Sequence, residues 1–466
     1  MTLPPDLPDT RVLDADEGSL VRAPQRFREL CPGRAALLVA DPATWNAAGR
    51  ELHAAFRAAG VPTARPFVFD APPRPSPAAL ELLLDALRSA SPPAQGRTTG
   101  RASPDGQAPP RSPDGQAPPR SPDGQAPPCP IAVGGGTLAD LCKRAAHLGS
   151  VPCLVFATAP SSAAFAAPGA RLADASGLPA ELPCPAPAAV FAEPEILARA
   201  PAALAAAGYG EAMACLVAGA DWLAAAALGA EAPVEPAAWA LRDGLQDRLL
   251  HPREIAQGDP AARAELFSAL ARLGLAAQRA RSPRPLAGAP HALAGAWALA
   301  GAGRAAPLGC LDGLGALCAL AAWDALFAAP FAAPDADRAA AAFPDAAARE
   351  AEASSLFPEG PLRRHALAAI RAKHPAPGEL RGRLDRLASL WDPLREKLDA
   401  ELMHPQRMRA MLEAAGCPVA PASLGLAPAR AAAAALAAPM LSPRYSVFDL
   451  ALETGRLPAC AAALLR

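Results

Sequence analysis

The chain has 466 residues, 52% of them hydrophobic, and a formal net charge of −1. This length predicts two domains, because single hydrophobic cores rarely grow beyond about 250–300 residues. A charge near zero gives no electrostatic basis for binding nucleic acid or an anionic membrane surface, so we expect neither as a partner.

Short strands alternate with helices in the first part of the chain. Strands are expected at residues 35–40, 66–69, 131–133 and 151–156, and helices at residues 46–59, 77–89 and 137–147. This alternation is typical of a parallel, Rossmann-like sheet with right-handed crossovers. We therefore assign residues 1–198 to an α/β domain.

A repeated segment interrupts this domain. Ser-Pro-Asp-Gly-Gln-Ala-Pro-Pro occurs three times with a period of nine, starting at Ser103, Ser112 and Ser121. The repeat has no aromatic or branched apolar residue to offset its ordering entropy, so residues 92–129 are predicted to be a disordered Pro-rich insert. It could bind a partner domain as a Pro-rich ligand. A tandem duplication within a surface loop is favoured, because loop entropy grows slowly with length.

From about residue 199 onward the strand signals vanish. Helices are expected at residues 202–207, 211–228, 260–273, 291–300, 311–327, 361–373, 380–402 and 406–415. The fold class is therefore an α/β domain followed by an all-helical domain over residues 199–466, with the functional cleft between them.

Location follows from the N-terminus and the cysteines. The first six residues lack the basic and apolar regions of a signal peptide. The Ala-rich stretches are broken by Pro, Gly or charge before they reach the roughly 20 residues of a membrane span. Ten cysteines without a Cys-x-x-Cys pair are typical of a reducing compartment, so we expect a cytoplasmic protein whose cysteines are mostly buried.

A glycine-rich turn is the first candidate site. Gly134-Gly135-Gly136-Thr137 follows a predicted strand and opens a predicted helix. Backbone N–H groups at such a helix N-terminus can bind a pyrophosphate. The same turn is equally common as a purely structural feature.

Six segments in chain order carry a broader pattern. They are the glycine turn through Asp140, Thr158-Ala-Pro-Ser161, Leu204-Ala-Ala-Ala-Gly-Tyr-Gly-Glu211, Arg284-Pro-Leu-Ala-Gly-Ala-Pro-His291, Leu308-Gly-Cys-Leu-Asp312-Gly-Leu-Gly-Ala316 and Arg444-Tyr-Ser-Val-Phe-Asp449. Together they resemble the glycerol-1-phosphate dehydrogenases, a branch of the metal-dependent alcohol dehydrogenase and dehydroquinate synthase superfamily. The resemblance covers roughly residues 30–91 and 130–460 and implies a dehydroquinate synthase-like fold.

The resemblance implies that the first domain binds a dinucleotide, NAD or NADP. The implied cofactor-binding residues are Asp41, Gly134, Gly135, Gly136, Thr137, Asp140, Thr158 and Ser161. Asp41 would lie near the adenosine ribose, but a helix N-cap is an equally good interpretation of an Asp at the end of a strand.

The resemblance also implies a catalytic metal site in the second domain, for zinc, nickel or iron. Glu211 stands where the family has an Asp ligand, and His291 matches a His ligand, so both are the expected catalytic and metal-binding residues. The third ligand of the family, a His, is Leu308 here. Asp312, one helical turn further on, could replace it. Because tight binding needs at least three N, O or S donors, bound metal is doubtful.

Two substrate-contacting positions differ as well. Ala163 stands where the family has an Asp, and Gly295 stands where it has a second His. The family interconverts dihydroxyacetone phosphate and sn-glycerol-1-phosphate in phospholipid metabolism, so the implied substrate is a small phosphorylated polyol or ketone, and a homodimer is possible. Losing these groups removes positioning and polarisation. The alternatives are a catalytically weakened or non-catalytic dinucleotide-binding paralogue and, third, a metal-free enzyme with another substrate.

Overall fold

The computed structural model describes the whole chain except residues 1–2, 5–6, 90–126, 300, 303–305 and 465–466. The predicted insert at residues 92–129 therefore lies almost entirely outside the described residues. The chain divides into two compact units. The nucleotide unit, as we name it, holds Met1–Thr158 and Ala164–Leu197, and the helical unit holds Ala159–Ala163 and Ala198–Arg466.

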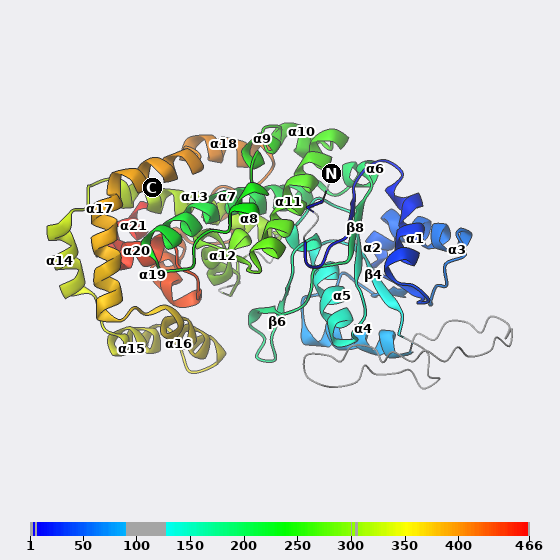
Figure 1. Ribbon diagram of the computed structural model, residues 1–466, viewed down its shortest axis with the longest axis horizontal. Helices are drawn as coiled ribbons and strands as arrows, with labels where there is room; N and C mark the ends of the chain where they lie inside the picture. The colour runs from blue at the N-terminus through cyan, green and yellow to red at the C-terminus, as the bar shows by residue number, and fades with distance from the viewer. Residues whose placement is uncertain (1–2, 5–6, 90–126, 300, 303–305, 465–466) are drawn as a thin grey trace. The chain divides into compact units, whose positions relative to one another are not determined.

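The nucleotide unit contains a six-stranded sheet in which every strand pair is parallel, as the sequence predicts (Figure 1). The strand order is β1-β8-β5-β4-β2-β3. The strands are β1 Val12–Asp14, β2 Ala36–Ala40, β3 Phe67–Val68, β4 Cys129–Gly134, β5 Leu154–Ala157 and β8 Ala189–Ala192. A separate antiparallel hairpin joins β6 Ala170–Ala173 and β7 Pro179–Leu182.

Helices cover both faces of this sheet (Figure 1). They are α1 Ser19–Leu30, α2 Pro42–Thr44, α3 Arg50–Ala58, α4 Pro77–Ser89, α5 Gly136–Leu148 and α6 Pro194–Ala198, with a π-helical turn at Trp45–Gly49 and a 3₁₀ turn, η2, at Ala163–Phe165. Phe27 of α1 and Phe56 of α3 pack edge to face at 5.4 Å in the core on one side of the sheet. Helix α4 has its predicted bounds.

Three features of this unit were not predicted. Strands β1 and β8 and the β6–β7 hairpin have three or four residues each, too few to show a clear alternation of apolar and polar side chains. The helix predicted from residue 46 begins earlier, at Pro42, because Asp41 caps it. The Asp41 carboxylate accepts a hydrogen bond from the Thr44 backbone N–H at 2.9 Å, in a capping box.

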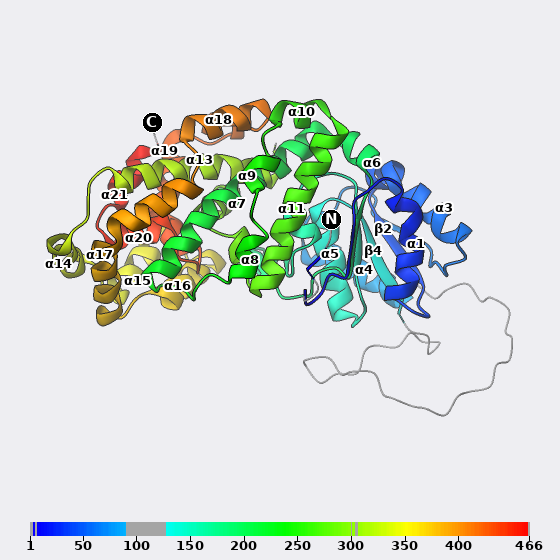
Figure 2. The same ribbon diagram turned by 45° about the horizontal axis from the view of Figure 1, so that its top comes forward.

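The helical unit has no strand among its described residues, as predicted. Its longer helices are α7 Ala202–Leu228, α11 Pro260–Ala280, α12 Ala289–Leu299, α13 Leu308–Phe327, α16 Pro361–Lys373, α17 Pro377–Glu401 and α19 Pro428–Leu441 (Figure 2). The shorter ones are α8 Pro236–Ala240, α9 Leu245–Arg248, α10 Pro252–Gln257, α14 Ala333–Ala342, α15 Ala346–Leu356, α18 Pro405–Ala414, α20 Val447–Glu453 and α21 Leu457–Ala463, with 3₁₀ turns at Arg284–Leu286 and Pro421–Leu424.

Helix α7 is one continuous helix, whereas the sequence predicted two helices separated by Gly208 and Gly210. The glycines mark close backbone contacts instead of a break. A Cβ atom at Gly208 would lie 1.9 Å from the Pro160 carbonyl oxygen, and one at Gly210 would lie 2.2 Å from the Gly309 carbonyl oxygen of α13. Only glycine allows these approaches, so the packing offsets its weak helix propensity.

Helices α7 and α13 are also long and apolar enough to cross a membrane, which corrects the expectation that no such stretch exists. In both helices 83% of the most apolar window is buried inside the protein. They therefore have the character of core helices. All ten cysteines are buried and free, in agreement with the sequence prediction.

Candidate functional site

The glycine turn lies at the carboxyl end of β4 and opens α5. Gly135 is the N-cap of α5, and no side chain caps this helix end. Gly135, Gly136 and Thr137 are half-buried. Gly134 has a φ of 157°, a backbone conformation that residues with a side chain rarely adopt. This uncapped helix end has the geometry of an anion-binding site.

Asp140, a predicted cofactor residue, is buried and paired with Lys143. Lys143 Nζ lies 2.8 Å from Asp140 Oδ1, and the two side chains expose 1% and 9% of their surface. The second carboxylate oxygen accepts the Arg171 backbone N–H at 3.1 Å. The carboxylate of Asp140 therefore links α5 to β6 inside the nucleotide unit.

Lys143 extends this contact to the loop after β5. Its ammonium group donates to the carbonyl oxygens of Ala164, Ala167 and Gly169 at 3.0, 3.0 and 2.6 Å. Burial alone would lower the pKa of Lys143, but the charge of Asp140 and their hydrogen bond outweigh it and raise the pKa. Sequence reasoning gave Lys143 no role. Its rarity was the available signal, since the chain has only three lysines among 44 basic residues.

Two further predicted cofactor residues belong to the segment that follows β5. Thr158 is buried in the nucleotide unit, and its backbone N–H donates to the Gly134 carbonyl oxygen at 3.2 Å. Ser161 is half-buried and belongs to the helical unit. Asp41, as described above, caps the helix that follows β2.

Glu211 lies on α7 and holds the short segment Ala159–Ala163 of the same unit. Its Oε1 atom accepts the Ala163 backbone N–H at 3.0 Å and the Ser162 hydroxyl at 3.4 Å. Ala163 itself is 0% exposed and belongs to the apolar core of the helical unit. Ser162 was not among the predicted residues.

The other predicted metal ligands lie on α12 and α13. His291 is half-buried in the first turn of α12, and Asp312 is buried on α13. Leu308 opens α13 with 36% of its surface exposed and brings no donor atom. Across the described residues, no three His, Cys, Asp or Glu side chains are grouped so that they could hold a metal ion. The donor set therefore does not fit a tightly bound catalytic metal.

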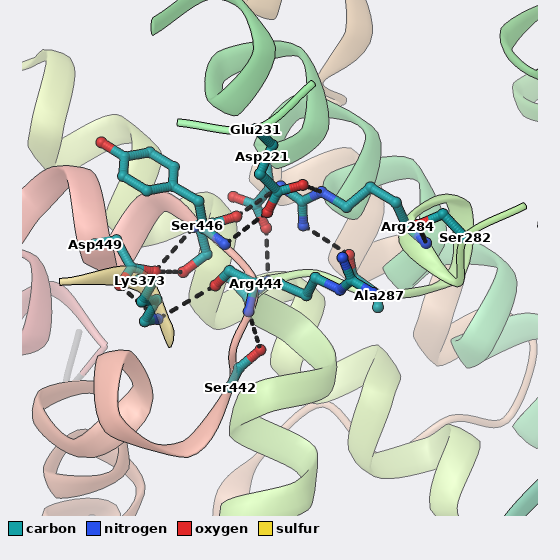
Figure 3. A network of polar contacts seen from close by, with 12 residues as sticks. Asp221, Glu231, Ser282, Arg284, Ala287, Lys373, Ser442, Arg444, Ser446 and Asp449 are labelled. Carbon is teal, nitrogen blue, oxygen red and sulfur yellow. Dashed lines mark hydrogen bonds and ion pairs between the residues drawn. The ribbon is translucent and has the colours of Figure 1, made fainter. Parts of the chain in front are cut away.

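A buried polar network lies further along α7 (Figure 3). Asp221, which is 0% exposed, accepts the backbone N–H groups of Ala289 at 2.6 Å and Val447 at 2.9 Å. Burial raises the pKa of Asp221 to about 6, although nearby Arg284 acts to lower it. Asp221 thus joins α7 to the N-termini of α12 and α20.

Arg284 and Lys373 continue the network (Figure 3). Arg284 Nε lies 3.0 Å from Glu231 Oε2, and its Nη2 donates to the Tyr445 carbonyl oxygen at 2.6 Å. Lys373 Nζ lies 2.6 Å from Asp449 Oδ1. A polar pocket of about 320 Å³ is lined by Glu231, Lys373 and Tyr445, among other residues, and not by Glu211 or His291. The predicted Arg284 and Asp449 motifs thus serve the packing of the helical unit.

Comparisons with known proteins agree with this architecture. The sequence model of a family described as iron-containing alcohol dehydrogenase matches residues 125–201. The glycerol-1-phosphate dehydrogenase [NAD(P)+] of Bacillus velezensis is 34% identical over 161 residues, which are 34% of this chain and 41% of that protein. Its counterpart in Pyrococcus furiosus is 33% identical over 162 residues, 34% of this chain and 46% of that protein. The match thus spans less than half the length of these relatives.

Solved structures extend the likeness to the whole fold. A probable glycerol dehydrogenase from Sinorhizobium meliloti has a TM-score of 0.59 at 15% identity, covering 98% of this chain and 97% of its own. Maleylacetate reductase from Agrobacterium tumefaciens has a TM-score of 0.55 at 16% identity, covering 100% and 97%. The predicted fold class and the resemblance to glycerol-1-phosphate dehydrogenases are both confirmed.

Proposed function

We propose that the protein is an NAD(P)-dependent oxidoreductase resembling sn-glycerol-1-phosphate dehydrogenase, acting on a small phosphorylated ketone or polyol. The observation that carries the proposal is the uncapped N-terminus of α5 beneath the glycine turn. A pyrophosphate bound there would accept hydrogen bonds from the backbone N–H groups of Gly135, Gly136 and Thr137 and interact favourably with the helix dipole. The sequence matches to glycerol-1-phosphate dehydrogenases support the same cofactor class.

The chemistry would be hydride transfer between the nicotinamide and the substrate carbon. The nucleotide unit supplies the binding of the cofactor, and the Asp140–Lys143 pair shapes the loop after β5. In the helical unit, His291 is the proposed group that donates a proton to the substrate oxygen, since an imidazole can serve as a general acid. Glu211 contributes by holding the segment that includes Ser162 and Ala163.

The residues that the structure describes do not fit a metal ion for this chemistry. The family's third ligand is Leu308 here, and the described part of the chain offers no cluster of three suitable donors. This observation is the reason to test a second candidate beside it, a catalytically weakened or non-catalytic dinucleotide-binding paralogue. The two candidates share the cofactor site and differ only in turnover.

The decisive measurement is calorimetric titration of the purified protein with NAD⁺, NADH, NADP⁺ and NADPH. We expect binding of at least one pair, and reduction of dihydroxyacetone phosphate that is slow or absent without added metal. Gly136→Asp places a carboxylate at the pyrophosphate position and should weaken binding at least tenfold. Gly378→Asp makes the same change in the first turn of α17, where a Cβ atom meets nothing within 4 Å, and should leave binding unchanged.

Failure of all four dinucleotides to bind at millimolar concentration would refute both candidates. Binding without turnover of dihydroxyacetone phosphate would select the second. A cytoplasmic location, a role in phospholipid metabolism and a homodimer remain parts of this proposal, open to cell fractionation, lipid analysis and size-exclusion chromatography.

A further inference from the structure

The segment Ala159–Ala163 has a special place in the chain. The residues on either side of it belong to the nucleotide unit, yet these five residues belong to the helical unit. Within the helical unit they contact α7 at two points. One is the carboxylate of Glu211, which accepts the Ala163 N–H at 3.0 Å and the Ser162 hydroxyl at 3.4 Å.

The second attachment lies one helical turn away on the same face of α7. Gly208 precedes Glu211 by three residues, and residues at this spacing share a helix face. A Cβ atom at Gly208 would lie 1.9 Å from the Pro160 carbonyl oxygen, so the segment runs against the bare backbone of α7. Packing at Gly208 and hydrogen bonding at Glu211 together fix residues 160–163 on the helix.

The length of the Glu211 side chain suits this role. Glutamate reaches one methylene further than aspartate, roughly 1.5 Å along the chain. Glu211 now reaches the Ala163 N–H at 3.0 Å. An aspartate at this position would place its oxygens beyond hydrogen-bonding distance of that N–H unless the backbone moved.

The surroundings of Ala163 point the same way. Its methyl group is 0% exposed in the apolar core, so an acidic side chain there would be buried beside the Glu211 carboxylate. Two carboxylates in such a position repel each other and lose hydration. The chain therefore excludes at residue 163 the acidic group that its relatives' motif has at this position.

From these contacts we propose that Glu211 is a positioning residue that fastens Ser162 and Ala163 to α7, in place of acting as a metal ligand. Dinucleotide binding by this chain is then independent of divalent metal. The inference deepens the proposed function, because Ser161, a predicted cofactor contact, lies within the fastened residues 160–163. It also explains why a longer side chain stands where the relatives' motif has aspartate.

Glu211→Gln and Glu211→Asp distinguish a backbone anchor from a metal ligand, because the variant that preserves one role impairs the other. A glutamine keeps the length and an acceptor oxygen for the Ala163 N–H, whereas an aspartate keeps the charge but is too short. A metal ligand would tolerate aspartate and lose affinity with glutamine. A backbone anchor would tolerate glutamine and fail with aspartate.

The experiment measures amide hydrogen exchange of residues 159–163, zinc and nickel content, and dinucleotide affinity with and without a chelator. We expect Glu211→Asp to speed exchange of the Ala163 amide about tenfold, as loss of one such hydrogen bond implies. Glu211→Gln should stay within about threefold of the original protein, and the chelator should change no affinity. Glu413→Gln and Glu413→Asp, at an exposed position on α18, are the matched controls.

One tightly bound metal per chain, lost in Glu211→Gln and kept in Glu211→Asp, would overturn the inference. So would equal exchange of the Ala163 amide in both variants. The exchange and metal readouts need no dinucleotide. If the protein binds none of the four dinucleotides, the proposed function is refuted. The comparison of Ala163 amide exchange between Glu211→Gln and Glu211→Asp would still decide the role of Glu211.

Discussion

The side chain of Asp221 accepts a hydrogen bond from the backbone N–H of Val447, which lies 226 residues further along the chain. The other oxygen of the same carboxylate accepts the N–H of Ala289 at 2.6 Å. One buried carboxylate thus satisfies the first N–H groups of two helices, α12 and α20, which would otherwise be unpaired in the core. Asp221 connects the middle of the helical unit to its C-terminal part.

The burial of the Asp221 carboxyl group predicts a pH-dependent contribution to stability, because burial raises its pKa more than the two backbone hydrogen bonds lower it. Because the folded-state pKa of Asp221, about 6, lies above the ordinary value of 3.8, its contribution is fully present below pH 3.8 and is lost as pH rises through 6. We therefore compare the unfolding free energy of the original protein with that of Asp221→Asn. The advantage of the original protein over the variant should shrink by up to roughly 3 kcal/mol as the pH rises from about 3.5 to 7. Urea denaturation at a series of pH values measures this difference. A difference that rises with pH would contradict the assignment.

The Asp140–Lys143 pair predicts strong coupling between two buried side chains. Lys143→Met should destabilise the nucleotide unit by about 3–5 kcal/mol, because it leaves the buried Asp140 carboxylate without its cation. Adding Asp140→Asn to this variant should recover part of the loss, since the uncompensated charge disappears. Denaturant unfolding of the two single variants and the double variant gives the coupling energy. Additive effects would show that the pair is not a unit.

The close approach at Gly208 predicts that replacing glycine by alanine lowers stability there but raises it at a helical glycine without such a contact. Gly208→Ala would force a Cβ atom against the Pro160 carbonyl oxygen and should destabilise the protein by about 1–3 kcal/mol. Gly382→Ala, inside α17, meets only an Arg386 side-chain atom at 4.0 Å and should stabilise by about 0.5–1 kcal/mol. Thermal melting compares the two, and a shift in the same direction for both would be inconsistent with the tight contact.

Restoring residues of the relatives' motif should have unequal consequences. Leu308→His replaces a partly exposed apolar side chain at the start of α13 and should change stability by less than about 0.5 kcal/mol. Ala163→Asp buries a second carboxylate beside Glu211 and should cost several kcal/mol. Leu308→His restores the third ligand position, and the triple variant that adds Ala163→Asp and Gly295→His should raise zinc or nickel occupancy, measured by elemental analysis of the purified protein. Full occupancy from Leu308→His alone would show that two donors were already in place.

The sequence predicted the parallel sheet and the switch to helices because both depend on long hydrophobic patterns. Helices α4 and α16 begin and end at the predicted residues, each starting with a proline that marks the first turn. Strands β1 and β8 were missed because three or four residues carry no clear period. Helix α7 was divided wrongly, since the identity of a residue does not reveal that another backbone lies against it.

The candidate site was harder to predict for a related reason. The motif singled out Asp140. Its buried partner Lys143, and the three backbone carbonyl oxygens that accept hydrogen bonds from Lys143, are visible only in the structure. For Asp41 the sequence left two roles open, and the structure shows the carboxylate in a capping box. The hydrogen bonds of Glu211 to Ser162 and Ala163 connect positions almost fifty residues apart, beyond the reach of any local pattern.

The glycines of α13 carry a wider lesson about recognising proteins by short patterns. A Cβ atom at Gly309 would lie 2.1 Å from the Ala207 carbonyl oxygen, and one at Gly315 would lie 2.4 Å from that of Pro290. No other amino acid can stand at these positions, whatever reaction the protein performs. A search pattern that scores such glycines therefore registers how tightly two helices pack. It does not report on the side chains between the glycines, which are the ones that could take part in a reaction.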